Sequence, residues 1–178
     1  MKVSGGYLKG RQFKSPPGFA THPISERVKM ALFNMLGDIN GLTVFDPFGG
    51  SGAISIEAIS LGAESSVCLD RDFKAYQTIV ENVKDLGLED KIKVTRANAA
   101  SWSENNLDKK FDLVICEPPF NDLQPNVVDK MVKHLKPNGL MVLSHPGSGS
   151  APTVNGVVVV DNRLYGDAAL AFYRQQAS

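Results

Sequence analysis

The chain has 178 residues, of which 43% are hydrophobic, and its 19 basic and 19 acidic side chains cancel to a formal net charge of zero. A chain of this length buries enough apolar surface for one stable domain without disulfides or a structural metal. The neutral balance excludes a uniformly basic nucleic-acid binder, so any basic surface must be local. We predict a single domain over residues 1–178, made of a basic arm at residues 1–24 and a core at residues 25–178.

The two cysteines, Cys68 and Cys116, each lie in an apolar run without a second Cys or a His at metal-ligand spacing. Reduced thiols in a cytoplasmic protein are the simplest interpretation, and no metal site is predicted. No apolar run approaches the roughly 20 residues that span a bilayer, and no cleavable leader pattern is present. We expect a cytoplasmic protein without membrane contact, and we favour a monomer.

The arm contains four basic residues and no acidic one before residue 26, namely Lys2, Lys9, Arg11 and Lys14. This composition fits a local nucleic-acid contact, and it fits a solvated edge equally well. Glycines within residues 3–13 predict a short hairpin or an extended arm. A helix is expected from about residue 25 to residue 36, because Ser25 is suited to the N-cap and apolar residues then repeat at helical spacing.

From Leu42 onward, short apolar or β-branched runs alternate with helical patterns. This alternation predicts an α/β protein with a Rossmann-like, doubly wound and mostly parallel sheet. Seven strands are expected, at residues 43–45, 66–69, 92–95, 113–116, 140–143, 157–160 and 168–173. Helices are expected at residues 53–61, 73–86 and 126–135, and residues 146–156 are expected to form one long loop.

The strongest motif is Asp46-Pro-Phe-Gly-Gly-Ser-Gly52, where an expected strand passes through a glycine-rich turn into a helix. Glycines let the backbone approach a ligand, and the first free amides of a helix donate hydrogen bonds. A dinucleotide is disfavoured, because Ser55 replaces the third fingerprint glycine and Asp46 would repel a pyrophosphate. Asp46 would instead attract an ammonium group, so S-adenosylmethionine is the predicted cofactor, with an ordinary turn as the alternative. The predicted contacts in this loop are Asp46, Phe48, Gly50, Ser51 and Gly52.

The next two expected strands end in polar residues that extend this site. Asp70 ends one strand at the place where an acid accepts hydrogen bonds from ribose hydroxyls, and Arg71 follows it. Asn98 and Ala99 come after the following strand and are suited to reading adenine. Each position also has a plainer interpretation, since Asp72 is a better N-cap and Asn98 is a common turn residue. Their order on adjacent strands favours the cofactor role.

A second loop, Glu117-Pro118-Pro119-Phe120, follows the fourth strand. Two prolines end the strand and leave carbonyl groups free to point into the crevice. Glu117 and a carbonyl can accept hydrogen bonds from an exocyclic amine, and Phe120 can stack on the base that carries it. We predict these four residues as the catalytic loop of an amine methyltransferase. A strand terminator with a core phenylalanine is the alternative.

With these motifs the chain resembles the RsmD-like family of 16S rRNA guanine-N2 methyltransferases. The resemblance runs from Gly5-Gly6 through the helix pattern at residues 25–36, the DPFGGSG loop and PPF to Leu164-Tyr-Gly-Asp167. It implies methylation of one guanine N2 amine in 16S rRNA, in an assembled or assembling small subunit. It also implies that Glu117 bridges the cofactor and the target amine. It also implies RNA contact by the arm and first helix, for which the candidates are Lys9, Arg11, His22 and Arg27.

The chain departs from that family at two places. Glu117 stands where the family usually has Asp, and His22-Pro23-Ile24 stands where it has Arg-Pro-Thr. PPF loops also resemble those of DNA adenine-N6 and protein glutamine-N5 methyltransferases, so other amine acceptors remain open. A cofactor-binding RNA scaffold without turnover and a nicotinamide-dependent reductase are further alternatives.

Overall fold

The computed structural model describes residues 1–18 and 24–176. Its elements in chain order are α1 (Glu26–Leu36), β1 (Thr43–Asp46), α2 (Ala53–Ser60), β2 (Ser65–Asp70), α3 (Phe73–Asp85), β3 (Ile92–Arg96), α4 (Ala99–Asn105), β4 (Phe111–Cys116), α5 (Pro125–Met131), the 3-10 turn η1 (Val132–His134), β5 (Leu135–Pro146), β6 (Val157–Tyr165) and β7 (Ala168–Gln175). The strands form one sheet in the order β3-β2-β1-β4-β5-β7-β6. The predicted α/β fold with a mostly parallel, doubly wound sheet of seven strands is confirmed.

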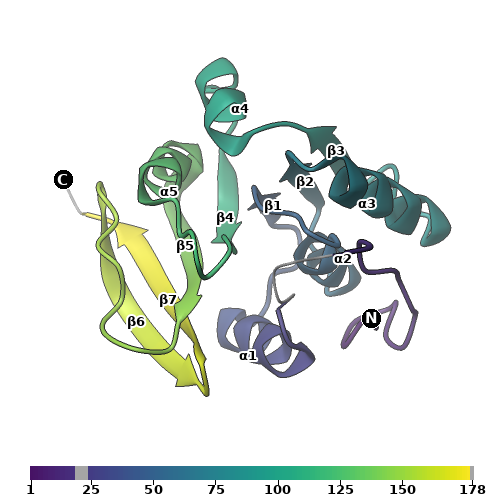
Figure 1. Cartoon of the computed structure of the whole chain (residues 1–178), viewed down its shortest axis with the longest axis horizontal. Helices are drawn as coiled ribbons and strands as arrows, with labels where there is room; N and C mark the ends of the chain where they lie inside the picture. The colour runs from purple at the N-terminus through teal and green to yellow at the C-terminus, as the bar shows by residue number, and fades with distance from the viewer. Residues whose placement is uncertain (19–23, 177–178) are drawn as a thin grey trace.

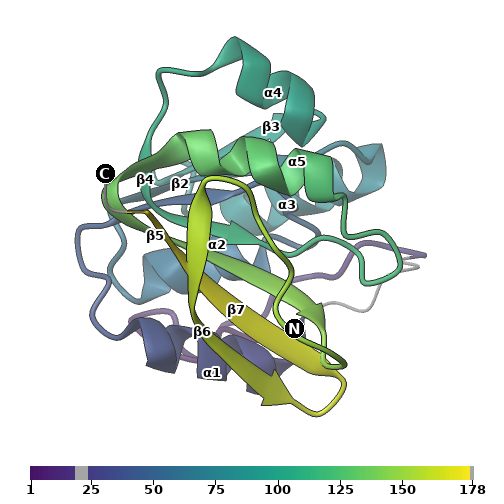
Figure 2. The same cartoon turned by 90° about the vertical axis from the view of Figure 1, so that its left-hand side faces the viewer.

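The sheet lies between two layers of helices. Helices α1, α2 and α3 cover one face, and α4 and α5 cover the other (Figures 1 and 2). Each layer of helices packs on its own apolar cluster. Val44 and Phe45, neighbours in β1, are both fully buried, but Val44 belongs to one cluster and Phe45 to the other. Successive strand residues point to opposite faces, so each face of the sheet has its own core. Among the described residues, no helix is long and apolar enough to cross a membrane.

The order of the last three strands places β7 inside the sheet. β7 pairs antiparallel with β5 on one side and with β6 on the other. Ala171, Phe172 and Tyr173 in its middle are buried, and the Tyr173 hydroxyl donates to the Pro152 carbonyl at 2.7 Å. β6 is consequently the edge strand, although it precedes β7 in the chain.

Several expected elements differ from the structure. Strand β6 continues to Tyr165, beyond the expected end at residue 160. Helix α4 was not expected, because Asn98 was interpreted as a cofactor-contacting or turn residue and the apolar spacing after it is weak. The expected helix at 126–135 stops at Met131 and continues as the turn η1, so that Leu135 already starts β5. Strand β5 is much longer than expected, because Pro137-Asn138-Gly139 resembles a turn yet continues the strand. Tertiary pairing has overridden local propensity in these segments.

The basic arm forms a hairpin that is anchored to α2. Lys2 and Gln12 face each other across the hairpin, and the Tyr7 amide donates to the Ser60 carbonyl at 3.0 Å. At Gly6 a side chain is impossible, because a Cβ atom would lie 1.8 Å from the Ser60 carbonyl oxygen. The hairpin is therefore a fixed part of the domain.

A buried ion pair holds the base of this hairpin. Lys29 of α1 and Glu57 of α2 approach to 3.1 Å, and their side chains are 1% and 3% exposed. The Glu57 carboxylate also accepts from the amides of Ser4 and Gly5, and the Lys29 ammonium donates to the Lys2 carbonyl. Both charges are thus satisfied by each other and by the hairpin backbone, as buried charges require.

Candidate active site

The glycine-rich loop leaves β1 and passes closely over β2. Gly50 and Gly52 have φ angles of 61° and 83°, in the left-handed region that favours glycine. The Gly49 amide donates to the Leu69 carbonyl at 2.7 Å, and a Cβ at Gly49 would lie 2.6 Å from the Cys68 sulfur. Gly49 was not among the predicted site residues, yet its lack of a side chain lets the loop lie this close to β2.

Asp46 is fully buried at the end of β1. Its Oδ2 accepts from the Ser55 hydroxyl at 2.8 Å and from the Cys68 thiol at 3.6 Å. Its Oδ1 has no hydrogen-bond partner within residues 1–18 and 24–176. Burial raises the pKa of Asp46 to about 6. A buried carboxylate oxygen that lacks a donor favours any ligand that brings one.

Asp70 ties the cofactor loop to the end of β2. Its Oδ2 accepts from the Gly50 amide and its Oδ1 from the Asp72 amide, both at 2.9 Å. Asp72, and not Asp70, is the N-cap of α3, since its side chain accepts from the Ala75 amide. Burial raises the pKa of Asp70. Each Asp70 oxygen keeps further acceptor capacity for a ribose hydroxyl.

Two residues that the sequence did not single out lie at this rim. The Arg96 guanidinium stacks over the Phe73 ring, 5.1 Å from its centroid. Arg96 Nε also donates to the carbonyl of Arg71, whose side chain is exposed. Phe73 begins α3, directly after β2, and Arg96 ends β3. Their contact follows from the parallel pairing of β2 with β3 and could not be predicted from their spacing in the sequence.

Asn98 begins α4 and lies at the same sheet edge. Its Oδ1 accepts from the amides of Ala100 and Ser101, so this oxygen is an N-cap. The Ala97 amide donates to the Asp70 carbonyl at 3.1 Å, which holds the loops after β2 and β3 together. The Asn98 side-chain NH₂ and the Ala99 backbone are the groups left for a ligand. Trp102 packs against Phe45, with ring centroids 4.8 Å apart.

The loop Glu117–Phe120 leaves β4 beside the glycine-rich loop, because β4 pairs parallel with β1. Glu117 is partly exposed, Pro118 is buried, and the Phe120 ring is 42% exposed. The carbonyl of Pro119 accepts from the Asp122 amide at 3.0 Å. The prediction of two free proline carbonyls therefore fails for Pro119, because the chain turns sharply after it.

The charge state of Glu117 depends on its neighbours. Burial and the nearby charge of Asp46 raise the pKa of Glu117 to about 8, although a hydrogen bond from the Ile24 backbone opposes this rise. Glu117 is therefore a stronger base than an ordinary glutamate. The contact with Ile24 also places the N-terminal end of α1 beside the catalytic loop.

The predicted RNA-binding residues do not lie together. Lys9 and Arg11 belong to the hairpin, and Arg11 donates to the Asp85 carbonyl at the end of α3. Because α2 and α3 run back from the carboxyl ends of the strands, their last residues lie at the opposite edge of the sheet. Arg27 is exposed on the first turn of α1, near the catalytic loop. His22 lies outside the described residues.

The chain matches a family model described as conserved hypothetical protein 95 over residues 1–174. It is 32% identical to YlbH of Bacillus subtilis, which is named provisionally as an rRNA methyltransferase, over 99% of this chain and 100% of that one. It is 31% identical to ribosomal RNA small subunit methyltransferase D of Buchnera aphidicola, over 67% of this chain and 62% of that one.

Solved structures with the same fold cover all or nearly all of the chain. The Escherichia coli protein yhhF, also named provisionally as a methyltransferase, superposes with a TM-score of 0.85, 25% identity and coverage of 100% of this chain and 99% of that one. A hypothetical protein of Thermus thermophilus gives a TM-score of 0.82 and 27% identity, with coverage of 97% and 98%. The likeness includes the hairpin and the C-terminal strands.

Proposed function

The chain belongs to the family described as conserved hypothetical protein 95, the RsmD family of methyltransferases, and from this membership we propose that it methylates 16S rRNA. The cofactor is S-adenosylmethionine, and the proposed acceptor is the exocyclic N2 amine of one guanine. We propose that the enzyme acts in the cytoplasm on an assembled or assembling small ribosomal subunit. The rRNA-related names of the relatives support the substrate class.

One observation carries the proposal: an acidic residue followed by two prolines and an exposed aromatic ring lies beside the glycine-rich loop. The pairing of β1 with β4 brings the two loops to the same sheet edge. The charge of Asp46, at the end of β1, also contributes to the raised pKa of Glu117. A cofactor-binding loop and an amine-accepting loop at this distance fit transfer of a small group from one ligand to another.

The residues present fit S-adenosylmethionine. The unpartnered Asp46 Oδ1 is an acceptor suited to the cofactor's ammonium group, directly or through water. Asp70 would receive the ribose hydroxyls, and the Asn98–Ala99 segment would contact the adenine. Phe48, Gly50, Ser51, Gly52 and Arg71 would complete this proposed site.

When bound, S-adenosylmethionine supplies a methyl group on a positively charged sulfur, so the leaving group is already activated. The Phe120 ring would stack on the target base, and the Pro118 carbonyl and Glu117 would accept hydrogen bonds from its amine. As the new nitrogen–carbon bond forms, the amine must lose a proton. An oxygen of the ionised Glu117 carboxylate would take that proton. Because the pKa of Glu117 is about 8, the ionised fraction, and with it the rate of methyl transfer, should rise as the pH approaches 8.

The proposal is tested with small-subunit particles and naked 16S rRNA from a strain that lacks this gene. The purified protein and labelled S-adenosylmethionine are added, and the RNA is digested to nucleosides. We expect label in N2-methylguanosine. Label in another nucleoside would contradict the guanine assignment, and binding of cofactor without any incorporation would indicate a scaffold.

One comparison supports a protein amine as a second candidate acceptor. The chain is 34% identical to ribosomal protein L11 methyltransferase of Thermosipho melanesiensis over 70% of its own length, although this covers only 41% of that protein. Label recovered in ribosomal proteins, and not in RNA, would favour this candidate.

A further inference from the structure

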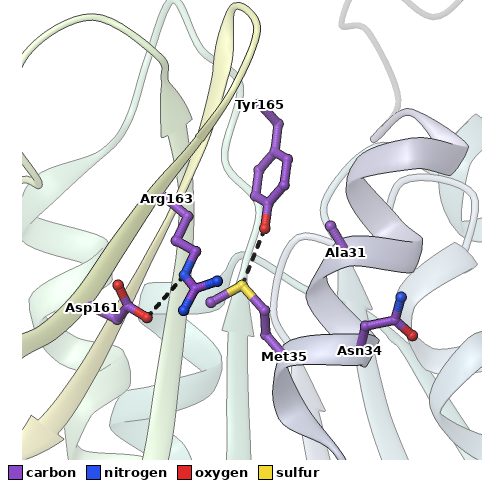
Figure 3. A pocket seen from close by; sticks show the side chains of 6 residues that line it. All are labelled: Ala31, Asn34, Met35, Asp161, Arg163 and Tyr165. Atoms are coloured by element: carbon purple, nitrogen blue, oxygen red, sulfur yellow. Dashed lines mark hydrogen bonds and ion pairs between the residues drawn. The ribbon is translucent and has the colours of Figure 1, made fainter.

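A cleft of about 490 Å³ lies outside the site described above. It opens between α1 and the edge strand β6 (Figure 3). Clefts of this size hold small ligands or single units of a polymer. Its lining is partly polar and comes from both elements: Ala31, Asn34, Met35, Asp161, Arg163 and Tyr165.

The sheet register places this cleft level with the catalytic loop. Leu170 of β7 pairs with Arg163 on one side and with Ser144 on the other. Leu143, the neighbour of Ser144, pairs with Cys116, which directly precedes Glu117. Arg163 therefore lies three strand spacings, or roughly 14 Å, from the end of β4, one row beyond Cys116. A polymer extending from the catalytic loop for a few units would reach Arg163.

Helix α1 connects the two places. Its N-terminal end lies beside Glu117, since the Ile24 backbone hydrogen-bonds to that residue. Ala31 and Asn34 line the cleft further along the helix (Figure 3). Arg27 lies four positions before Ala31 and seven before Asn34, so it is on the same helix face, one turn closer to the catalytic loop. One face of α1 therefore runs from the cation Arg27, near the catalytic loop, to the cleft.

The chemistry of the cleft suits a nucleotide. Arg163 Nε donates to Asp161 at 3.1 Å, which orients the guanidinium. Among the residues described, neither terminal nitrogen of Arg163 has a hydrogen-bond partner, and its side chain is 58% exposed. Such a planar fork of donors matches the oxygens of a phosphate. The Tyr165 ring, whose hydroxyl donates to the Met35 sulfur, gives the cleft an apolar wall (Figure 3).

We infer that the cleft between α1 and β6 holds the RNA strand next to the target nucleotide, with Arg163 and Arg27 contacting its phosphates. This inference rests on the proposed function, because it presupposes an RNA substrate. In this arrangement α1 and β6 make the RNA contact that lies nearest the catalytic loop. The hairpin cations Lys9 and Arg11 lie at the opposite edge of the sheet and would meet a different part of the RNA.

Arg163→Ala tests the inference, with Arg174→Ala as the matched control. Arg174 is an exposed arginine of the neighbouring strand, but it donates to the Asn138 carbonyl at the far edge of the sheet. Methyl transfer to small-subunit particles from the gene-deleted strain gives KM and kcat, and calorimetry gives the affinity for S-adenosylmethionine. We expect Arg163→Ala to raise KM for the particles about tenfold, with cofactor affinity unchanged.

The salt dependence of particle binding distinguishes a phosphate contact from a structural role. Loss of one phosphate contact lowers the slope of log affinity against log salt by about one. We expect this reduction for Arg163→Ala, little reduction for Arg163→Lys, and none for Arg174→Ala. If the parent is active and the two variants, Arg163→Ala and Arg174→Ala, give equal KM values and equal slopes, the inference is overturned while the proposed function stands. A parent that methylates no RNA would overturn it together with the proposed function.

A photocrosslinker attached through Asn34→Cys identifies the occupant of the cleft directly. Cys68 and Cys116 are buried, so the introduced thiol is the accessible one among the described residues. We expect crosslinks to RNA within a few nucleotides of the methylated base. Crosslinks to a ribosomal protein, or to distant RNA only, would contradict the assignment.

Discussion

Glu117 has one methylene more than the aspartate that the RsmD family usually carries at this position. Its surroundings also raise its pKa and make it a stronger base than an ordinary glutamate. Its raised pKa of about 8 arises from burial and from Asp46 behind it. A longer side chain brings its oxygens further into the crevice, where small displacements change rates strongly. Its length and its pKa therefore both bear on catalysis.

Glu117→Gln should lower kcat for methyl transfer by about 100-fold or more, because the amide cannot take the amine proton. Cofactor affinity should change much less, since Glu117 is not expected to be the main cofactor contact. Single-turnover assays and calorimetry measure the two effects, with Glu117→Asp as the control that keeps a carboxylate. Turnover of Glu117→Gln at the parent rate would exclude the proposed base.

Asp70→Ala should weaken S-adenosylmethionine binding about tenfold or more, because the carboxylate both anchors the Gly50 amide and would receive the ribose. Calorimetry on the parent and the variant measures this. Asp90→Ala, at an exposed acid between α3 and β3, is the control for lost charge. An unchanged affinity in Asp70→Ala would remove Asp70 from the cofactor site.

Several residues of the site were accessible from the sequence because their roles are local. Asp46 and Asp70 stand at strand ends, which a strand pattern alone identifies. Other features depend on how neighbouring strands and turns pack. These are the capping of α4 by Asn98, the hydrogen bond that the Pro119 carbonyl accepts, and the close approach of Gly49 to β2. No spacing along the chain encodes those contacts.

At the scale of elements, the helices and strands with strong periodicity were predictable, and the exceptions are instructive. Seven strand positions were found, but β5 extends to 12 residues through a segment that resembles a turn. Helix α4 has only seven residues, with weak apolar spacing, so tertiary packing stabilises it more than propensity does. The anchoring of the hairpin on α2 was not predictable, since Ser4 and Glu57 are far apart in sequence.

Glu57→Gln should destabilise the domain by about 3 kcal/mol or more, because it leaves the buried Lys29 ammonium without its counter-charge. Urea denaturation measures the free energy of unfolding. Trypsin should also cleave at Lys9 or Arg11 faster in this variant, since the hairpin loses its anchor. Glu104→Gln removes an exposed partner of Lys130 and should change stability little. Equal effects of the two variants would contradict the structural role of the buried pair.

For the whole molecule, two acids at one sheet edge, the fully buried Asp46 and the partly exposed Glu117, make stability depend on pH. The pKa of Asp46 is about 6 and that of Glu117 is about 8 in the folded protein, whereas both are near 4 in an unfolded chain. Above pH 4 the unfolded chain loses these protons while the folded chain keeps them. Their contribution to the free energy of unfolding therefore falls as the pH rises from about 4 to about 8.

Glu117→Gln should accordingly gain stability relative to the parent as the pH is raised from 5 to 8, because the amide carries no charge to bury. Asp46→Asn should show its relative gain at lower pH, mainly between pH 4 and pH 6. Urea denaturation of the parent and both variants across this range measures the differences. A stability difference that does not change with pH would show that these carboxyls titrate normally.

The interior position of β7 also constrains how the polypeptide reaches its fold during synthesis. β7 is made after the other six strands, yet it must enter between β5 and β6. Until it emerges from the ribosome, β5 and β6 have no partner on the sides that β7 will occupy, and α1 lacks part of the surface on which it packs. The nascent chain therefore exposes unpaired strand edges until late in translation, and such edges promote aggregation. A pause in translation before codon 168 would be expected to lower the yield of folded protein more than an equal pause before codon 43.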